Sequence, residues 1–175
     1  HHVMMYPNTY SLGVVLYCAL FLWFVTEYLV FERVHLYTYD IFAERLGFKL
    51  GWGCFAFYPY FYLIGLWAVA HRPDPGTPWW ALTIYALLFF WGWIFTRGAN
   101  MQKYWFKTRP GEAFLGILEP EVLSDGKNTL LSGGFWGVSR HVNYLGETVQ
   151  AVALTLLLGY PGAWVAWLYP LYYVA

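Results

Sequence analysis

The chain has 175 residues, of which 59% are hydrophobic and 11% are charged, and its formal net charge is zero. A soluble domain usually carries about a quarter charged residues, so this composition excludes an ordinary soluble protein. The absence of a basic excess also excludes a strongly basic nucleic-acid-binding protein. Cys18 and Cys54 form no CxxC pair, so no zinc site or disulfide framework is indicated, and we interpret both as buried structural thiols.

The first seventy residues predict two membrane spans. Residues 10–31 are apolar apart from Glu27 and are numerous enough to cross a bilayer. After a polar stretch, residues 50–70 form a second apolar run that contains Pro59, which a membrane helix tolerates better than a soluble helix does. We therefore expect one helix from each run.

A proline-rich loop at residues 71–78 separates the second span from a third, at residues 79–96, so these two spans should form an antiparallel hairpin. The polar residues 97–144 carry six of the ten basic side chains, and this excess predicts that the segment lies on the cytoplasmic side. Residues 148–175 are again apolar, but Gly and Pro at 159–162 predict two short helices or a helical hairpin.

Together these elements predict an all-α, polytopic membrane helix bundle with at least four crossing segments and no sheet, because in lipid only helices or closed barrels satisfy the backbone. Residues 1–175 should form a single integral membrane domain.

Two lysines lie at the expected membrane exit of the third span. Lys103 and Lys107 are four residues apart, so they share one face of a helix, where a bound phosphate would relieve their repulsion. The alternative is a juxtamembrane basic patch that meets anionic lipid, and the spacing by itself favours that alternative.

A glycine-rich segment at residues 126–147 carries side chains suited to a nucleotide. Arg140 offers a planar fork for phosphate, Asn143 an amide, and Trp136 and Tyr144 flat faces for a heterocycle. No GxGxxG run follows a strand, so a Rossmann domain is not indicated. The pattern predicts a nucleotide site at the membrane surface, with Leu131 as an apolar wall, whereas His141 alone is more simply a structural histidine.

Two motif blocks are long and specific. They are Arg97-Gly98-Ala99-Asn100-x-Gln102-Lys103 and Gly126-Lys127-Asn128-x-Leu130-Leu131-Ser132-Gly133-x-Phe135-Trp136-Gly137-Val138-x-Arg140-His141-x-Asn143-Tyr144-x-Gly146. With upstream matches at Phe24-Val25-Thr26-Glu27, Asp40-Ile41 and Leu46-Gly47-Phe48, the chain resembles the sterol reductase family, which includes the delta-14 and delta-7 sterol reductases and the membrane half of the lamin B receptor. The run that begins at Arg97 favours the delta-14 branch.

The chain departs from this family at a few positions. Cys54 and Glu147 stand where the family usually has aspartate, Lys107 where it has arginine, and Val142 where it has proline or phenylalanine. The family also continues with an acidic helical tail that helps to hold the cofactor. We therefore expect this chain to be part of a longer protein.

The resemblance implies an enzyme that uses NADPH, bound at the cytoplasmic face, to saturate a ring double bond of a sterol. The alkene would first be protonated, and hydride transfer to the resulting carbocation would follow. Tyr62, which matches a family tyrosine, is the first candidate for the proton donor. Glu27 is the second, because a carboxyl at membrane depth is a functional candidate by default and burial would keep its proton available.

The cofactor residues implied are Lys103, Lys107, Leu131, Trp136, Arg140, Asn143 and Tyr144. The expected partners are a sterol and membrane lipid, in an endoplasmic reticulum-type membrane if the protein is eukaryotic or an inner membrane if it is bacterial. Two other classes stay open. One is a membrane isoprenylcysteine-type methyltransferase that uses S-adenosylmethionine, and the other is a non-catalytic sterol-binding membrane protein.

Overall fold

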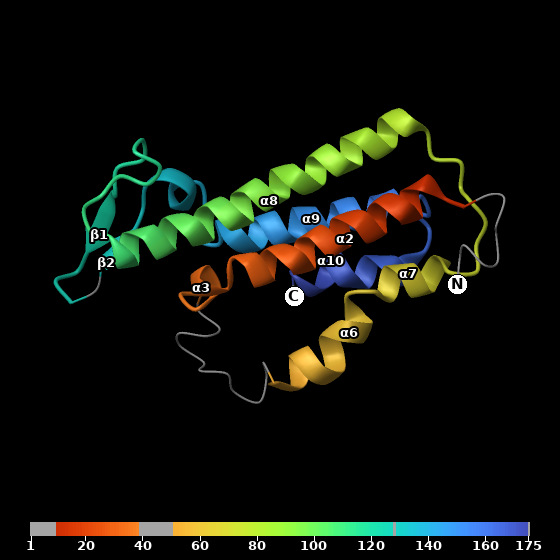
Figure 1. The fold of residues 1–175 in the computed structure, drawn as a ribbon, viewed down its shortest axis with the longest axis horizontal. Helices are drawn as coiled ribbons and strands as arrows, with labels where there is room; N and C mark the ends of the chain where they lie inside the picture. The colour runs from red at the N-terminus through yellow and green to blue at the C-terminus, as the bar shows by residue number, and fades with distance from the viewer. Residues whose placement is uncertain (1–9, 39–50, 128, 175) are drawn as a thin grey trace.

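The computed structural model describes residues 10–38, 51–127 and 129–174, so the family matches at Asp40-Ile41, Leu46-Gly47-Phe48 and Asn128 lie outside the described residues. The described part is mostly helical (Figure 1). In chain order the elements are α2 (Leu12–Val30), α3 (Glu32–His35), the π-helix η1 (Gly53–Phe57), α6 (Tyr58–Phe61), α7 (Ile64–Val69), α8 (Trp79–Thr108), β1 (Val122–Ser124), β2 (Thr129–Leu131), the 3-10 helix η2 (Gly134–Gly137), α9 (Val142–Leu157), the 3-10 helix η3 (Trp164–Trp167) and α10 (Leu168–Tyr172).

Helix α9 is the centre of the bundle. It lies along α8 over most of its length and also packs against α2 and α10 (Figure 1). Phe89 of α8 and Leu154 and Leu157 of α9 are fully buried between these helices. Their burial removes a large apolar area from the surroundings and holds the three longest helices together.

Helices α2 and α8 are the two elements of the described chain that are long and apolar enough to cross a membrane. The first span is thereby confirmed as a helix. The third predicted span is longer than expected, because α8 continues past Thr96 to Thr108. At 1.5 Å per residue its 30 residues measure about 45 Å, against about 30 Å for a bilayer core. α8 is therefore longer than a bilayer core requires, and its last turns carry the two lysines.

Large apolar side chains point outward from both long helices. Leu29 is 72% exposed and Trp79 is 74% exposed. Cys18 and Cys54 are exposed as well, so the interpretation of both as buried thiols was wrong. In a protein of this composition an apolar side chain does not need a protein core, because lipid can cover it.

The second apolar segment is broken, and the prediction of one continuous helix was wrong. A π-helical turn, η1, precedes Pro59, and the chain breaks again between α6 and α7 at Tyr62 and Leu63. Proline lacks an N–H and its ring presses on the carbonyl four residues earlier, which explains the irregular turn before it. After the break, α7 packs chiefly against η3 and α10 rather than forming the expected hairpin with α8.

The last apolar segment is interrupted where the sequence predicted. Helix α9 ends at Leu157, and η3 and α10 follow the turn. Gly159 has a φ of +72°, and a Cβ there would lie 2.4 Å from Oγ1 of Thr77. Glycine is thus required both by the backbone conformation and by the close approach of the loop before α8.

The polar segment between α8 and α9 contains a short β-hairpin, so the prediction of no sheet was wrong. β1 and β2 pair antiparallel, with Val122 opposite Leu131. In the turn, Oδ1 of Asp125 accepts a hydrogen bond of 2.9 Å from the Lys127 N–H, and Gly126 has a φ of +87°. These strands lie outside the apolar spans, where water can satisfy the open strand edges, so the argument from lipid does not apply to them.

Candidate functional site

The two motif blocks dock against each other at the end of α8. Gln102 is 2% exposed. Its Nε2 donates to the Gly133 carbonyl at 3.1 Å, and its Oε1 accepts from the Phe135 N–H at 3.0 Å. Trp136 donates from its indole Nε1 to the Ala99 carbonyl at 3.0 Å. One buried amide and one indole thus fix the loop that precedes α9 on the surface of α8.

Glycine at position 98 makes this docking possible. A Cβ there would lie 2.3 Å from the ring of Phe135, well inside van der Waals contact. The aromatic ring therefore rests directly on the α8 backbone. This explains physically why the first block has glycine between Arg97 and Ala99.

The helices α8 and α9 approach each other through a second pair of small residues. A Cβ on Gly146 would lie 2.3 Å from Oγ1 of Thr96, and a Cβ on Gly92 would lie 2.6 Å from the Gly146 carbonyl oxygen. Thr96 donates its hydroxyl to the Asn143 carbonyl at 3.0 Å. Such contacts between small residues are typical of closely packed membrane helices.

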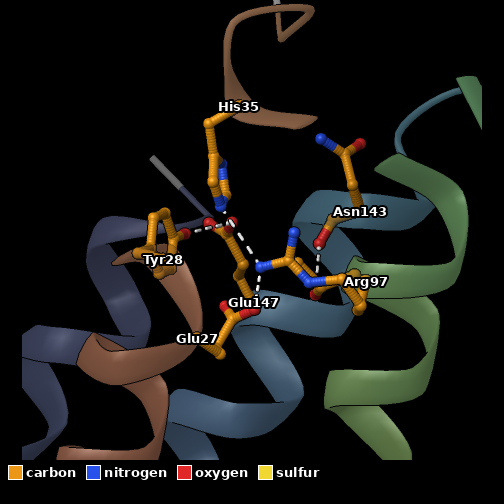
Figure 2. A network of polar contacts seen from close by, with 7 residues as sticks. Glu27, Tyr28, His35, Arg97, Asn143 and Glu147 are labelled. Atoms are coloured by element: carbon orange, nitrogen blue, oxygen red, sulfur yellow. Dashed lines mark hydrogen bonds and ion pairs between the residues drawn. The ribbon is translucent and has the colours of Figure 1, made fainter. Parts of the chain in front are cut away.

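Charged and polar side chains gather where α2, α3, α8 and α9 meet, two of them buried and three half-buried (Figure 2). We call Glu27, Tyr28, His35, Arg97 and Glu147 the charge cluster. Arg97 and Glu27 form an ion pair and are 3% and 5% exposed. The Tyr28 hydroxyl donates to Oε1 of Glu147 at 3.1 Å. Even a paired charge is costly to remove from water, and ionisable residues at this depth mark a candidate functional site.

His35 completes the cluster at its α3 side. Its Nε2 lies 3.2 Å from Nη2 of Arg97, and its ring stacks on Tyr28 with 4.2 Å between centroids. A guanidinium can only donate, so Nε2 must accept, and the imidazole proton is on Nδ1. Burial lowers the pKa of His35 below its ordinary value, which agrees with a neutral ring.

Glu27 is buried, as the sequence led us to expect, but it is held by Arg97. A direct guanidinium partner favours the carboxylate form. The expected role of Glu27 as a store of a proton therefore has less support than its role as the counter-ion of Arg97.

Tyr62 lies at the break after α6, inside an aromatic group and not on the outer surface. Its ring stacks on Tyr58 at 5.0 Å and contacts Tyr169 at 5.1 Å and Phe24 at 6.2 Å. Its carbonyl accepts the Tyr17 hydroxyl at 3.0 Å. A cavity of about 150 Å³ lies elsewhere, beside Gly159 and Pro161, and Tyr62 does not line it.

The lysines and Trp136 are brought together by the docking of the two blocks. Nζ of Lys103 lies 5.9 Å from the centre of the Trp136 ring. Lys107 follows one turn later on α8 and is exposed. A cation over an indole, with a second cation beside it, forms a positive surface at this end of the molecule.

The other predicted cofactor residues are spread around this point. Arg140 and Tyr144 are exposed near the start of α9. Asn143 is half-buried, and its side-chain amide points away from the charge cluster (Figure 2). Leu131 is buried in β2 and lines a small hollow with Gln102, Glu112 and several apolar side chains.

Sequence reasoning missed Arg97, His35, Tyr28 and Glu147 as site residues. A signal was present for Arg97, because an arginine at the end of an apolar run needs a partner at the same depth, and Glu27 is such a partner. The sequence singled out Glu147 only as a departure from the family's usual aspartate, and the structure shows it bonded to Tyr28. Nothing in the spacing connects residues 28 and 147.

The sequence is similar to proteins of one known family. The model of the ergosterol biosynthesis ERG4/ERG24 family matches residues 1–175. The delta(14)-sterol reductase of Arabidopsis thaliana is 37% identical over 158 residues, which are 90% of this chain and 40% of that protein. The mouse (Mus musculus) delta(14)-sterol reductase is 36% identical over 152 residues, 86% of this chain and 34% of that protein.

The delta(14)-sterol reductase of Schizosaccharomyces pombe is 31% identical over 174 residues, which are 99% of this chain and 40% of that protein. This chain spans about a third to two-fifths of the length of the curated relatives it matches. The family match covers the whole sequence, and helices α2 and α8 are long and apolar enough to cross a membrane. The chain belongs to the ergosterol biosynthesis ERG4/ERG24 family.

Proposed function

We propose that this chain forms part of an NADPH-dependent sterol reductase that saturates a ring double bond, the delta-14 bond in preference to the delta-7 bond. The observation that carries the proposal is the docking of the two motif blocks, which sets Lys103 beside Trp136. The relatives named above are all delta(14)-sterol reductases, which supports the choice of bond.

The residues present suit a phosphate-bearing dinucleotide. Lys103 and Lys107 would bind phosphate, and the exposed fork of Arg140 would add a further contact. Trp136 and Tyr144 offer flat faces to the bases, Asn143 an amide, and Leu131 an apolar wall. When bound, NADPH supplies the hydride for the reduction.

The protein has to supply the proton. A ring alkene accepts hydride poorly until one of its carbons is protonated, so an acid must face the double bond. We assign this task to Tyr62, whose ring packs among aromatic rings that would shield a developing carbocation from water. Glu27 remains the alternative donor.

In the membrane we propose a multi-pass arrangement, with α2 and α8 crossing the bilayer and the end of α8 on the cytoplasmic side. The excess of basic residues in the segment after α8 supports this orientation. The membrane would be of the endoplasmic reticulum type in a eukaryote and the inner membrane in a bacterium.

Product analysis tests the function. The purified full-length protein is incubated with NADPH and a mixed panel of unsaturated sterols, and we expect loss of the delta-14 double bond. A protein stabilised against heat by S-adenosylmethionine, and not by NADPH, would instead be a methyltransferase. Binding of sterol without NADPH oxidation for every sterol tried would indicate a non-catalytic protein.

Two variants test the assigned residues. Changing both Lys103 and Lys107 to Gln should weaken NADPH more than NADH, because only NADPH carries a 2′-phosphate, and equal losses would contradict this contact. Tyr62→Phe keeps the ring and removes the hydroxyl, so turnover should fall by about 10²–10⁴-fold with NADPH affinity unchanged. A wild-type rate in this variant would remove Tyr62 from the reaction.

A further inference from the structure

The cavity of about 150 Å³ beside Gly159 has no part in the proposed function. It lies between the first turns of α8 and the end of α9, and it is lined by Thr77, Tyr85, Thr155, Leu156, Gly159, Pro161 and Trp167. Tyr85 and Lys103 are 18 residues apart on α8, which is about 27 Å of helix. The cavity is therefore remote from the lysine to which a cofactor phosphate is assigned.

The loop before α8 and the turn after α9 form one wall of this cavity and are held together by several contacts. The Tyr160 hydroxyl donates to the Pro73 carbonyl, and the guanidinium of Arg72 lies 5.0 Å from the centre of the Tyr160 ring. Gly159 and Thr77 approach so closely that a Cβ on the glycine would lie 2.4 Å from Oγ1 of the threonine. The wall is thus preformed, as is usual for binding sites of small molecules.

The polar groups of the lining are neutral. Among the described residues that line the cavity none is charged, which disfavours an ionic ligand. The hydroxyl of Thr155 is already shared between the Ala151 and Ala166 carbonyls, at 3.0 and 3.2 Å. Thr77 and Tyr85 are therefore the hydroxyls that can bond a ligand, and each can both donate and accept. A ligand with one neutral hydroxyl matches them.

The size and shape of the cavity suit a ring. A cavity of about 150 Å³ in a protein can hold one benzene molecule, so a single six-membered ring fills this space. Tyr85 and Trp167 offer flat faces to such a ring. The indole of Trp167 is fixed, because its Nε1 donates to the Pro161 carbonyl at 2.9 Å.

The position along α8 indicates where this ring would come from. Trp79 and Trp80 are both exposed at the start of the helix, and tryptophans of this kind mark the boundary between membrane and water. With α8 across the bilayer as proposed above, Tyr85 lies about 9 Å inside that boundary. A sterol in a bilayer places its hydroxyl near the boundary and its apolar rings among the acyl chains, so its first ring lies at this depth.

We propose that the cavity is a second sterol site, which binds the hydroxyl-bearing ring of a membrane sterol through Thr77 and Tyr85. The inference rests on the proposed placement of α8 in the membrane and not on the reduction. Because the contacts are to the ring hydroxyl, the site binds sterols with and without the delta-14 bond.

The test is photolabelling of the full-length protein in lipid nanodiscs without NADPH. The probe is a sterol that keeps its hydroxyl and carries a diazirine in the neighbouring ring, and mass spectrometry locates the label. We expect saturable labelling within residues 77–85 and 155–167. A delta-14 sterol and the same sterol with that bond saturated should compete equally, whereas hexadecanol, which has a hydroxyl but no ring, should not compete.

Thr77→Val combined with Tyr85→Phe removes both hydroxyls and keeps the shape of the cavity. The affinity for the probe should fall by about 3–10-fold for each hydroxyl. Thr83→Val combined with Tyr10→Phe is the matched control and should bind as the wild type does, because both residues are exposed and neither lines the cavity. Leu156→Trp fills the cavity and should abolish saturable labelling there.

Equal affinity in the hydroxyl variant and in its control would overturn the inference, and so would equal competition by hexadecanol. Competition by the delta-14 sterol alone would assign the cavity to the substrate of the reduction, which also overturns a second site. The labelling needs no turnover. A protein that is labelled here but reduces no sterol therefore contradicts only the proposed function, and a protein that reduces sterol without this label contradicts only the second site.

Discussion

Two polar regions lie side by side on α8 and hold their partners in different ways. The charge cluster uses ions, with Arg97 paired to Glu27, whereas the junction one turn later uses neutral groups, with Gln102 bonded at both ends of its amide. The neutral junction satisfies its buried polar atoms, but the charge cluster leaves two nitrogens of Arg97 without a partner among the described residues. Neutral hydrogen bonds can join two segments without the desolvation cost of buried charges. The presence of charges in the cluster therefore points to chemistry rather than to stability.

The largest expected effect comes from breaking the ion pair on one side. Arg97→Met leaves the Glu27 carboxylate buried without its cation and should lower the free energy of unfolding by about 3–5 kcal/mol. The thermal midpoint in detergent measures this. Changing Glu27 to Met in addition should recover most of the loss, because the buried charge is then removed.

Arg109→Met is the matched control for that variant. Arg109 pairs with Glu112 at 3.7 Å, but both side chains are more than half exposed. The loss should be below about 1 kcal/mol. Equal losses for Arg97→Met and Arg109→Met would show that burial of the ion pair does not matter.

Packing between α8 and α9 should be the next most sensitive feature. Gly146→Ala places a methyl group 2.3 Å from Oγ1 of Thr96, so the helices must separate, at a cost of about 1–3 kcal/mol. Gly162→Ala is the control, because a Cβ there meets nothing within 4 Å. A Gly146→Ala protein as stable as the control would contradict the close approach.

The neutral junction can be opened by Gln102→Ala. The Gly133 carbonyl and the Phe135 N–H both lose their partner, and the loop that carries Trp136 should loosen, at a cost of about 1–3 kcal/mol. Faster hydrogen exchange at residues 133–137 and weaker NADPH binding are the readouts. Gln102→Glu keeps the acceptor for the Phe135 N–H, so its exchange and NADPH binding should lie between those of the wild type and the alanine variant. Unchanged hydrogen exchange in the alanine variant would contradict the docking.

The smallest effect concerns pH. The pKa of His35 is lowered in the folded protein, so between that value and the unfolded value of about 6.5 the unfolded chain binds more protons. Stability therefore falls as the pH drops below about 6.5. His35→Gln should flatten this dependence of the thermal midpoint, while His71→Gln, at an exposed histidine, should keep it. The same slope in His35→Gln as in the wild type would assign the dependence to another group.

Much of the fold could be predicted from local sequence. The apolar run of residues 10–31 and the glycine and proline at 159–162 determine a helix and a break with no help from the rest of the chain. The hairpin of β1 and β2 could not be predicted in the same way, because it depends on water satisfying the open strand edges, and the hydropathy of a segment does not report this. Pro59 indicates a local irregularity in the second apolar segment, but not the further break at Tyr62 and Leu63.

The sequence by itself indicated helices apolar enough to cross a membrane and a resemblance to the sterol reductase family, and it predicted a site at Lys103, Trp136 and their motif neighbours. Composition and contiguous motifs can be read directly from the amino-acid sequence, so they do not require a structure. Only the tertiary structure joined Glu27 to Arg97 and Tyr28 to Glu147, residues 70 and 119 positions apart. The reason is physical. The energy of a buried ion pair depends on the distance between the two charges and on their depth in the bundle, and neither quantity follows from their separation along the chain.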